Sequence, residues 1–508
     1  MKKRSQILAL LTAAGMILAP AAGVFAEEAP SHVNVIPFMW MDGLDPGDGW
    51  NGWTVTRCGV GETLTTINEN MEMVGQLADT WEQVDDVTYR YHIRQGVKFS
   101  NGDDLTPQNV VDSILRTAEI NSRGGNLKLE SAEVDGENVI FKTTEPYSAF
   151  QYIITEPMCI IVDTGIDMSN FANEPICTGP YKVVEYVPEE RIELAANEYY
   201  WDGVAAVDTI TVKNVDNGTK VDSILAGDLD VAGAPAPTTL SLVEGEEGID
   251  MVKVLGTRES DIELNCREGH PTADVNLRRA LSCALNREVL AQIAGNGYSQ
   301  PLYTCFPASV GYRTEEVEGQ YYDLDKAKEY LAAAGYEDTD GNGFVEKDGE
   351  ELLLTFSLSS NSSTAVYEAI QDMWKTLGVN SEIALLENTR DIRDSGDFDI
   401  ITGGWQTMNN GDGQSYLKNR WSEGGNDNYS GFYSEAFQKV MAELDAAFDQ
   451  DARVAAYMEA QKVLADECPS LFLYANDNIT LVNTNKVQNV TVFPIDYYFV
   501  TNKWTPVE

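Results

Sequence analysis

Apolar and polar residues alternate over short stretches in several parts of the chain. From Tyr89 to Ile93, aromatic and aliphatic side chains alternate with Arg90 and His92, which is the pattern of a half-buried strand. Three more stretches are rich in β-branched or aliphatic residues and predict strands over 139–143, 209–213 and 352–356. Strand signals therefore occur in both halves of the sequence.

Helical periodicity accompanies these strands. Thr106 followed by Pro107 predicts a helix start, because threonine caps a first turn well and proline suits the first helical position. Apolar residues from Leu277 to Leu285 line one helical face, and Gly295 offers a stop. The same signals predict helices over 325–334 before Gly335, over 366–377 before Gly378, and two more within about 434–466.

Strands and helices are interleaved throughout, with no repeat of fixed period. The stretches rich in Gly, Pro and Asn between them are too short to be disordered linkers. The pattern predicts an α/β protein whose lobes pack together.

The first 26 residues have the features of a secretory signal peptide. Lys2, Lys3 and Arg4 precede a short apolar run, and small residues end at Ala26. No cysteine precedes Cys58, so nothing near the expected cleavage site could carry a lipid anchor. We expect an exported, soluble product in the periplasmic space or at the extracellular face of the cell envelope.

The composition excludes some classes of function. The 508 residues include 81 acidic and 35 basic side chains, and the net charge of -46 disfavours nucleic acid and anionic membranes as partners. Seven cysteines form no Cys-x-x-Cys pair, so buried free thiols are expected for most of them, with a Cys159–Cys177 bridge as the alternative. No nucleophile elbow, zinc-protease motif or phosphate loop is present, and we expect no enzyme activity.

Four sequence blocks resemble a known family. They are LADTWEQVDDVTYRYHIRQGVKFSNGDDLTPQNVVDSILR from Leu77, CTGPYKVVEYVPEERIELAANEYYWDG from Cys177, DVNLRRALSCALNREVL from Asp274 and YDLDKAKEYLAAAGY from Tyr322. In this order they are similar to signature elements of the extracellular solute-binding proteins of family 5, the peptide and nickel receptors of ABC importers. The resemblance covers nearly all of the chain after residue 26.

The resemblance implies a two-lobed α/β fold of the periplasmic-binding-protein type II class with an additional inserted domain. Such lobes close over a solute about a hinge. By analogy, the inserted domain spans 56–171 and lobe II spans 263–477. Lobe I is discontinuous and consists of 27–55, 172–262 and 478–508.

The same resemblance points to a ligand site near Trp405. In the family, a strand ending in Gly-Trp faces the cleft, and here it reads GDFDIITGGWQTMNNGDGQSYL. Thr402 and Met408 replace an arginine and an aspartate that hold peptide termini in the peptide receptors, which indicates a changed ligand or changed contacts to its termini. Asp412 could receive an ammonium group instead, and Arg393 matches a position that is often basic in the family.

A nickel or metal-chelate receptor of the same family is the alternative. Borderline metals favour imidazole ligands, and the chain has only His32, His92 and His270. The nickel branch places a histidine where Thr402 stands, so a wrapped chelate is favoured over a directly ligated ion. A non-transport binding or chaperone role also stays open, because a fold hosts functions that its site decides.

The loop DTDGNGFVEKDGE resembles the start of an EF-hand loop. Asp338, Asp340 and Asn342 supply oxygen ligands at its first, third and fifth positions. The twelfth position is Gly349 instead of the usual bidentate glutamate, unless Glu350 reaches round. Calcium is thus the one cofactor considered, with a plain acidic turn as the alternative.

Taken together, the sequence predicts a monomeric receptor that captures a small solute, most simply a short peptide. It would deliver the solute to the permease subunits of an ABC transporter.

Overall fold

The computed structural model describes residues 30–37, 43–408 and 410–507. The predicted signal peptide over 1–26 lies outside these residues. Within them, Ser31 onward forms one compact unit.

One mixed sheet organises this unit. Among the described residues it has eleven strands, and ten of them follow one another in the order β17-β16-β18-β12-β19-β11-β1-β10-β9-β8, while β13 pairs with β19. Their bounds in that order are Asn380–Leu386, Leu353–Ser359, Ile400–Gln406, Ile249–Leu264, Ser470–Asn483, Val231–Gly233, His32–Ile36, Thr209–Lys213, Arg191–Ala196 and Tyr181–Val187, with β13 at Ser299–Pro301.

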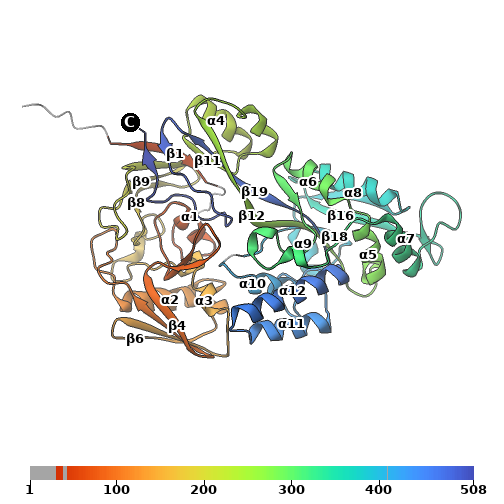
Figure 1. Ribbon diagram of the computed structural model, residues 1–508, viewed down its shortest axis with the longest axis horizontal. Helices are drawn as coiled ribbons and strands as arrows, with labels where there is room; N and C mark the ends of the chain where they lie inside the picture. The colour runs from red at the N-terminus through yellow and green to blue at the C-terminus, as the bar shows by residue number, and fades with distance from the viewer. Residues whose placement is uncertain (1–29, 38–42, 409, 508) are drawn as a thin grey trace, which may run out of the picture. The chain divides into compact units, whose positions relative to one another are not determined.

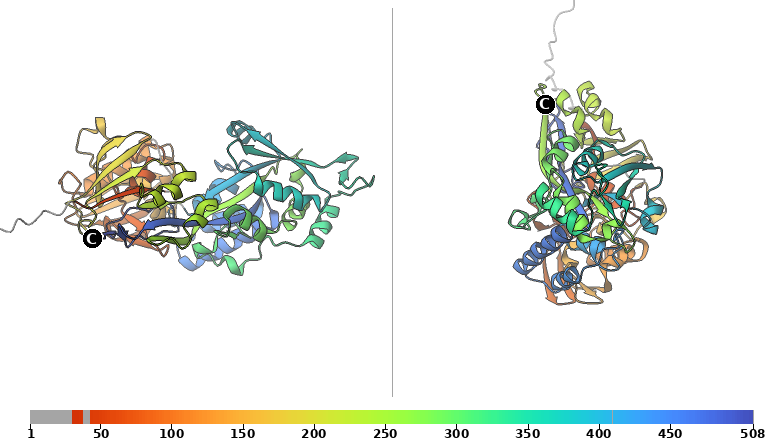
Figure 2. Two further views of the ribbon diagram at one scale, coloured as in Figure 1. Left: turned by 90° about the horizontal axis from the view of Figure 1, so that it is seen from above. Right: turned by 90° about the vertical axis from the view of Figure 1, so that its right-hand side faces the viewer.

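The long antiparallel pair of β12 and β19 connects the two halves of this sheet. In Figure 1 the two strands run side by side, and β19, in blue, can be followed again in the left view of Figure 2. On one side β19 pairs with β11, and on the other β12 pairs with β18. The predicted domain boundaries at 262/263 and 477/478 fall inside these strands, and the domain limits themselves stay a prediction.

Helices cover the half of the sheet that contains β16 and β18. Apolar residues of these strands pack against helical faces in a buried cluster around Leu281, Phe356 and Trp374. The helices of this part, with the short helix that follows β17, are α5 Val275–Cys283, α6 Arg287–Gly295, α7 Leu324–Ala333, α8 Ala365–Lys375 and α9 Arg390–Ser395.

A second buried cluster surrounds Phe306, Trp421 and Tyr457. Three helices supply most of it, and they are α10 Gln414–Trp421, α11 Glu435–Asp445 and α12 Gln450–Glu467.

The other half of the sheet packs around β1, β8, β9 and β10. Its buried core includes Val35, Tyr181 and Ile210. The elements beside it are α1 Asn51–Arg57 and α4 Lys220–Ala226, together with the small strand pair of β20 Val487–Gln488 and β21 Thr505–Pro506.

A separate four-stranded sheet has the order β4-β5-β7-β6. The strands are β4 Ala78–Asp85, β5 Thr88–Ile93, β7 Asn138–Thr143 and β6 Leu129–Asp135, and the helices of this part are α2 Pro107–Ile120 and α3 Phe150–Ile153. Val110 and Ile114 of α2 share a buried core with Tyr91 and Phe141 of the sheet. Two short hairpins complete the strands: β2 Thr65–Ile67 with β3 Met73–Gly75, and β14 Glu346–Lys347 with β15 Glu350–Glu351.

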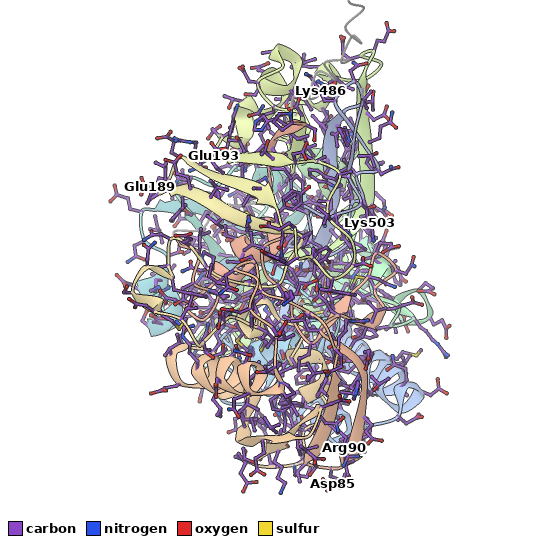
Figure 3. The ribbon with its side chains drawn as sticks, turned by 90° about the vertical axis from the view of Figure 1, so that its left-hand side faces the viewer. Asp85, Arg90, Glu189, Glu193, Lys486 and Lys503 are labelled. Carbon is purple, nitrogen blue, oxygen red and sulfur yellow. The ribbon has the colours of Figure 1, made fainter. Side chains whose placement is uncertain are left out.

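Charged side chains lie at hairpin turns and on the neighbouring strands of both sheets. Asp85 and Arg90 lie at the end of the β4–β5 hairpin, and Glu189 and Glu193 project outward from the β8–β9 hairpin (Figure 3). This placement agrees with the strongly acidic composition.

Most predicted elements are present. The strand over 209–213 matches β10, and Thr106 caps α2 by accepting a hydrogen bond from the backbone N–H of Asn109 at 3.3 Å. The helix predicted from Leu277 to the stop at Gly295 is wrong as a single element, because it breaks after Cys283 and restarts at Arg287. Asn286 caps the restart by accepting from the N–H of Val289, which gives the backbone a local partner that a continuous helix would not need.

All seven cysteines lie in the described part, and each is a free thiol. Cys159 and Cys177, the pair considered for a bridge, are both buried. Within the described residues, no helix has the length and apolar character that a bilayer crossing requires.

Candidate functional site

The strands β12 and β18 place Trp405 beside a row of carboxylates. The two strands are antiparallel, and Trp405 lies opposite Glu259 in the register. Because side chains alternate along a strand, Glu259, Asp261 and Glu263 all project from one face of β12. All three are buried.

Arg420 of α10 is the counter-ion for this row. Its Nη1 lies 3.0 Å from Glu259, and its Nη2 lies 2.8 Å from Asp261 and 2.7 Å from Glu263. The four side chains are at most 2% exposed. Three buried carboxylates therefore share one guanidinium group.

Trp405 packs on the same guanidinium. The Arg420 Cζ lies 4.9 Å from the centre of the Trp405 ring, a cation–π distance. Gly403 makes room for this arrangement, because a Cβ at that position would lie 1.8 Å from Asp261 Oδ1 and 2.9 Å from Trp405 Nε1. Any side chain at Gly403 would displace the indole or the carboxylate.

A cavity of about 390 Å³ opens in front of Trp405. Its walls come from sequence regions that are far apart. One wall contains Trp50 and Trp53 at the start of α1, and Arg123 after α2, while the other contains Trp405 and Asp427. Arg123 pairs with Glu156, and its Cζ lies 3.6 Å from the centre of the Trp50 ring.

Several buried nitrogen atoms around this cavity have no hydrogen-bond partner in the described residues. They include the indole Nε1 of Trp53 and of Trp405 and the amide Nε2 of Gln406. Trp53 and Gln406 are only 7% and 6% exposed, so water reaches them poorly. A buried donor without an acceptor is costly, and a ligand that brings acceptor oxygens would remove that cost.

Burial also changes the acid–base properties of the site. It raises the pKa of Glu263 to about 7 and that of Glu259 well above its usual range, with the neighbouring Asp261 as a second cause for Glu259. Burial likewise raises the pKa of Asp427 at the cavity wall. Desolvated carboxylates thus lie both behind the cavity and in its wall.

Two other cavities are comparable in size but differ in chemistry. One, of about 610 Å³, lies beside Tyr321 and Arg279, and another, of about 350 Å³, contains Glu62. Within the described residues, neither is lined by a buried polar side-chain atom that lacks a partner. Glu62 accepts hydrogen bonds from Thr178, Tyr200 and Trp201. The Trp405 cavity is therefore the best candidate for solute binding.

The structure places the predicted site residues in different surroundings. Trp405 lines the cavity, whereas Arg393, Thr402, Met408 and Asp412 do not. Arg393 lies on α9 and donates from Nη2 to the backbone oxygen of Thr402 at 2.8 Å. The predicted ligand roles of these four residues stay predictions.

Met408 and Asp412 line a different cavity, of about 370 Å³. Met408 is 3% exposed and packs in the cluster of α10 to α12. Asp412 pairs with the buried Arg453 at 2.7 Å and accepts from the N–H of Gln414 at 2.9 Å. Both carboxylate oxygens of Asp412 thus have partners within the protein.

The sequence reasoning did not find several residues of the Trp405 cavity. Trp50 and Trp53 are spaced three apart, which is a weak signal for one helical face. Arg123, Arg420 and Asp427 gave no signal, because they meet only through tertiary packing.

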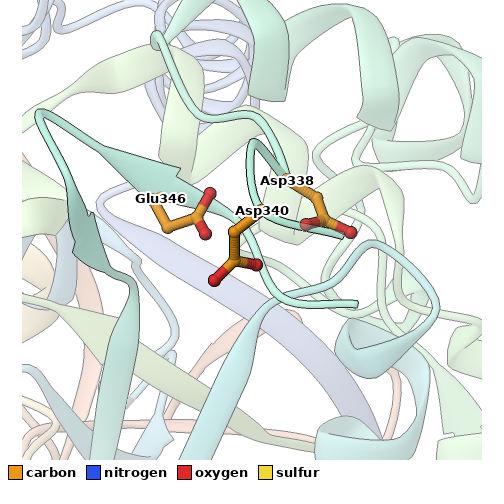
Figure 4. A group of neighbouring side chains, drawn as sticks. All are labelled: Asp338, Asp340 and Glu346. Atoms are coloured by element: carbon orange, nitrogen blue, oxygen red, sulfur yellow. The ribbon is translucent and has the colours of Figure 1, made fainter. Parts of the chain in front are cut away.

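The predicted calcium loop brings carboxylates together. Oxygens of Asp338, Asp340 and Glu346 all lie within 4.8 Å of one another (Figure 4). Glu346, which was not among the predicted ligands, also accepts from the N–H of Thr339 at 2.8 Å. Asp338 and Asn342 accept hydrogen bonds from loop N–H groups. Calcium binding here stays a prediction.

The three histidines, all in the described part, lie outside the lining of the Trp405 cavity. His92 is 2.7 Å from Asp79, His270 is 3.7 Å from Asp399, and His32 contacts Thr209 at 2.9 Å. Direct ligation of a metal by imidazole has no support at this cavity.

Comparisons with known proteins agree with the resemblance seen in the sequence. The chain is 26% identical over 441 residues to the oligopeptide-binding protein AppA of Bacillus subtilis, covering 82% of this chain and 80% of the relative. Among solved structures, a nickel ABC transporter protein from Bacillus halodurans has a TM-score of 0.79 at 25% identity, covering 94% of this chain and all of that one. AppA in complex with a nonapeptide has a TM-score of 0.75 at 22% identity, covering 94% of this chain and all of AppA.

These full-length matches confirm the mixed α/β fold of this class. The family model of the bacterial extracellular solute-binding proteins, family 5 (middle region), matches residues 72–428, well over half of the chain. The protein is therefore a non-enzymatic solute receptor of the ABC-importer type and belongs to family 5 of the bacterial extracellular solute-binding proteins.

Proposed function

We propose that this receptor captures a short peptide in the Trp405 cavity and delivers it to the permease subunits of its ABC importer. The cavity lies between residues of the α1–α3 region and residues of β12, β18 and α10. A ligand held there contacts both groups of elements and is shielded from water, as a transport receptor requires.

The unpartnered donors carry this proposal. Trp53, Trp405 and Gln406 line the cavity, and each carries a buried N–H group that lacks an acceptor among the described residues, while an extended peptide offers a carbonyl oxygen at every residue. The rings of Trp50 and Trp405 add apolar faces that accept varied side chains. Such a surface favours a ligand recognised by its backbone.

The names of similar proteins support the same choice. One relative is an oligopeptide-binding protein, and one structural match holds a nonapeptide. Another match is a nickel transporter protein. A metal chelate is the alternative solute, and the absence of histidine from the cavity lining of the described residues favours the peptide.

Thermal unfolding of the refolded, chelator-treated protein tests the proposal. The panel contains di- to pentapeptides, nickel with and without free histidine, and simple sugars. A ligand at about 100 times its dissociation constant adds roughly 2.7 kcal/mol to the free energy of unfolding, which raises the midpoint measurably.

Variants then connect binding to the cavity. Trp405→Phe keeps an aromatic face but removes the N–H, and we expect at least a tenfold weaker peptide affinity by calorimetry, while Trp405→Ala weakens it further. Trp81→Ala on β4, away from the cavity, should leave the affinity unchanged. A stabilisation by nickel–histidine alone would overturn the peptide proposal, and unaltered affinity in both Trp405 variants would overturn the site.

A further inference from the structure

The charged residues that line the Trp405 cavity differ in whether they form an ion pair within 4.0 Å. Arg123 pairs with Glu156, and Arg258 lies 2.9 Å from Asp496. Arg420 pairs with the three carboxylates of β12. In the described part of the chain, Asp427 is the remaining charged lining residue, and it has no basic group within 4.0 Å.

Asp427 is held by its loop, and Arg420 and Arg393 act on its carboxylate only from beyond ion-pair distance. Its backbone N–H donates to Asn419 at 3.0 Å. The hydroxyl of Tyr429 contacts Oδ1 at 3.4 Å, a weak bond, and no hydrogen bond to Oδ2 occurs among the described residues. One carboxylate oxygen therefore remains available in the cavity wall.

Carboxylates also outnumber basic groups around the cavity. The lining residues and their ion-pair partners bring six carboxylates, and even with Arg57, which shares Asp496, they bring four guanidinium groups. Burial raises the pKa of Glu259 and of Glu263, so these two carboxylates contribute less negative charge than the count implies. The local feature that favours a positive charge on the ligand is the carboxylate oxygen of Asp427 that has no hydrogen-bond partner among the described residues.

The unpartnered donors supply an independent sign of a ligand at the same place. Trp53 and Gln406 line this cavity and are both at least nine-tenths buried, and each has a side-chain nitrogen without an acceptor among the described residues. The ligand must then combine acceptor oxygens with its positive charge. A short peptide with a free ammonium group or a basic side chain has both.

We propose that Asp427 receives a cationic group of the solute, an ammonium or guanidinium, and thereby selects cationic solutes over neutral and anionic ones. The inference rests on the proposed peptide function for its choice of probes, but it depends on the charge of the solute rather than on its peptide bonds. A cation beside Asp427 compensates this carboxylate for the hydration that it loses on burial.

Calorimetry with four tripeptides tests the role of Asp427. The probes are trialanine with free termini, N-acetyl-trialanine amide, and Ala-Lys-Ala in the free and the doubly blocked form. Asp427→Asn keeps the shape of the side chain and removes its charge. Glu423→Gln is the matched control, because Glu423 is an exposed acid of the same loop that does not line the cavity.

We expect Asp427→Asn to weaken binding of the cationic probe at least tenfold and to leave the blocked neutral probe within about twofold, with Glu423→Gln neutral for both. If Asp427→Asn weakens binding of both free tripeptides but of neither blocked one, the cation is the α-ammonium. If blocked Ala-Lys-Ala retains the sensitivity, the cation is the side chain. Equal effects on charged and neutral probes, or no effect on either, would overturn the proposal.

A second panel separates this inference from the proposed function. It contains lysine amide, arginine amide, spermidine, glutarate and glucose, which have no peptide chain. Binding of the amines without any peptide would overturn the peptide proposal and retain the cation site, provided that Asp427→Asn abolishes it. Binding only of neutral or anionic solutes would overturn the cation site, and no binding in either panel would overturn both.

Discussion

Two arginines of this protein face the same number of carboxylates in opposite environments. Arg420 is 1% exposed and meets Glu259, Asp261 and Glu263, which are at most 2% exposed. Arg191 on β9 is 32% exposed and also meets three acids, Glu185, Glu190 and Glu193, which are 32 to 64% exposed; Glu193 is labelled in Figure 3. The pair of substitutions Arg420→Met and Arg191→Met therefore isolates the effect of burial.

Burial decides the expected magnitudes. Removing one partner of a buried ion pair leaves uncompensated charge and destabilises a protein by about 3–5 kcal/mol. Methionine preserves much of the side-chain volume, so a packing defect adds little at Arg420. A surface ion pair contributes about 0–1 kcal/mol, because water solvates the acids that remain. Arg420→Met should thus lower the free energy of unfolding by several times as much as Arg191→Met.

The pH gives a second and sharper test. The pKa of Glu263 is raised to about 7, so near pH 5.5 this carboxylate is largely protonated in the folded protein. At that pH, loss of Arg420 leaves less buried negative charge without a counter-ion. The difference in the free energy of unfolding between the parent and Arg420→Met should therefore be smaller at pH 5.5 than at pH 8, by at least about 1 kcal/mol. Urea unfolding at both pH values measures this difference. The reasoning would be refuted if Arg420→Met and Arg191→Met lowered the free energy of unfolding equally, or if the difference between Arg420→Met and the parent did not change with pH.

Three further outcomes are expected. The free energy of unfolding of the parent, measured in urea, should fall as the pH rises from about 4.5 through about 7. Glu62 and Glu263 have raised pKa values in the folded protein, so the stability that they contribute is present below their unfolded pKa and is lost above their folded pKa. A free energy of unfolding that stays constant over this pH range would contradict those shifts. Thr106→Ala should cost about 1 kcal/mol by removing the cap of α2, while Thr106→Ser should cost little. Calcium should raise the thermal midpoint of the parent and not of Asp338→Asn, and the same small response in both would exclude the predicted loop site.

Local signals in the sequence were sufficient for much of the fold. Thr106 and Pro107 start α2 where expected, and Gly335 and Gly378, both with positive φ, follow α7 and α8. These features depend on a few neighbouring residues. The pairing of β12 with β19 does not, because it joins segments about 200 residues apart, and periodicity carries no information on such partners.

The sequence predicted a residue of the candidate site only where a short local motif contains that residue. Trp405 was found through the Gly-Trp element and does line the cavity. Asp412 lies seven residues later, but its carboxylate pairs with Arg453, a residue that no local pattern connects to it. Charge partners are fixed by packing, so a sequence shows which acids exist and not which ones are left without a partner.

This distinction decides which variants can map the site. Arg420 lines the cavity and also neutralises the buried row on β12, so weaker binding in an Arg420 variant could reflect a disturbed fold rather than a lost ligand contact. Asp412 presents the same difficulty through Arg453. Trp405→Phe and Asp427→Asn change one N–H and one unpaired carboxylate, respectively, and break no ion pair within the described residues. Their effects on affinity, measured at equal stability, are the ones that report on the solute.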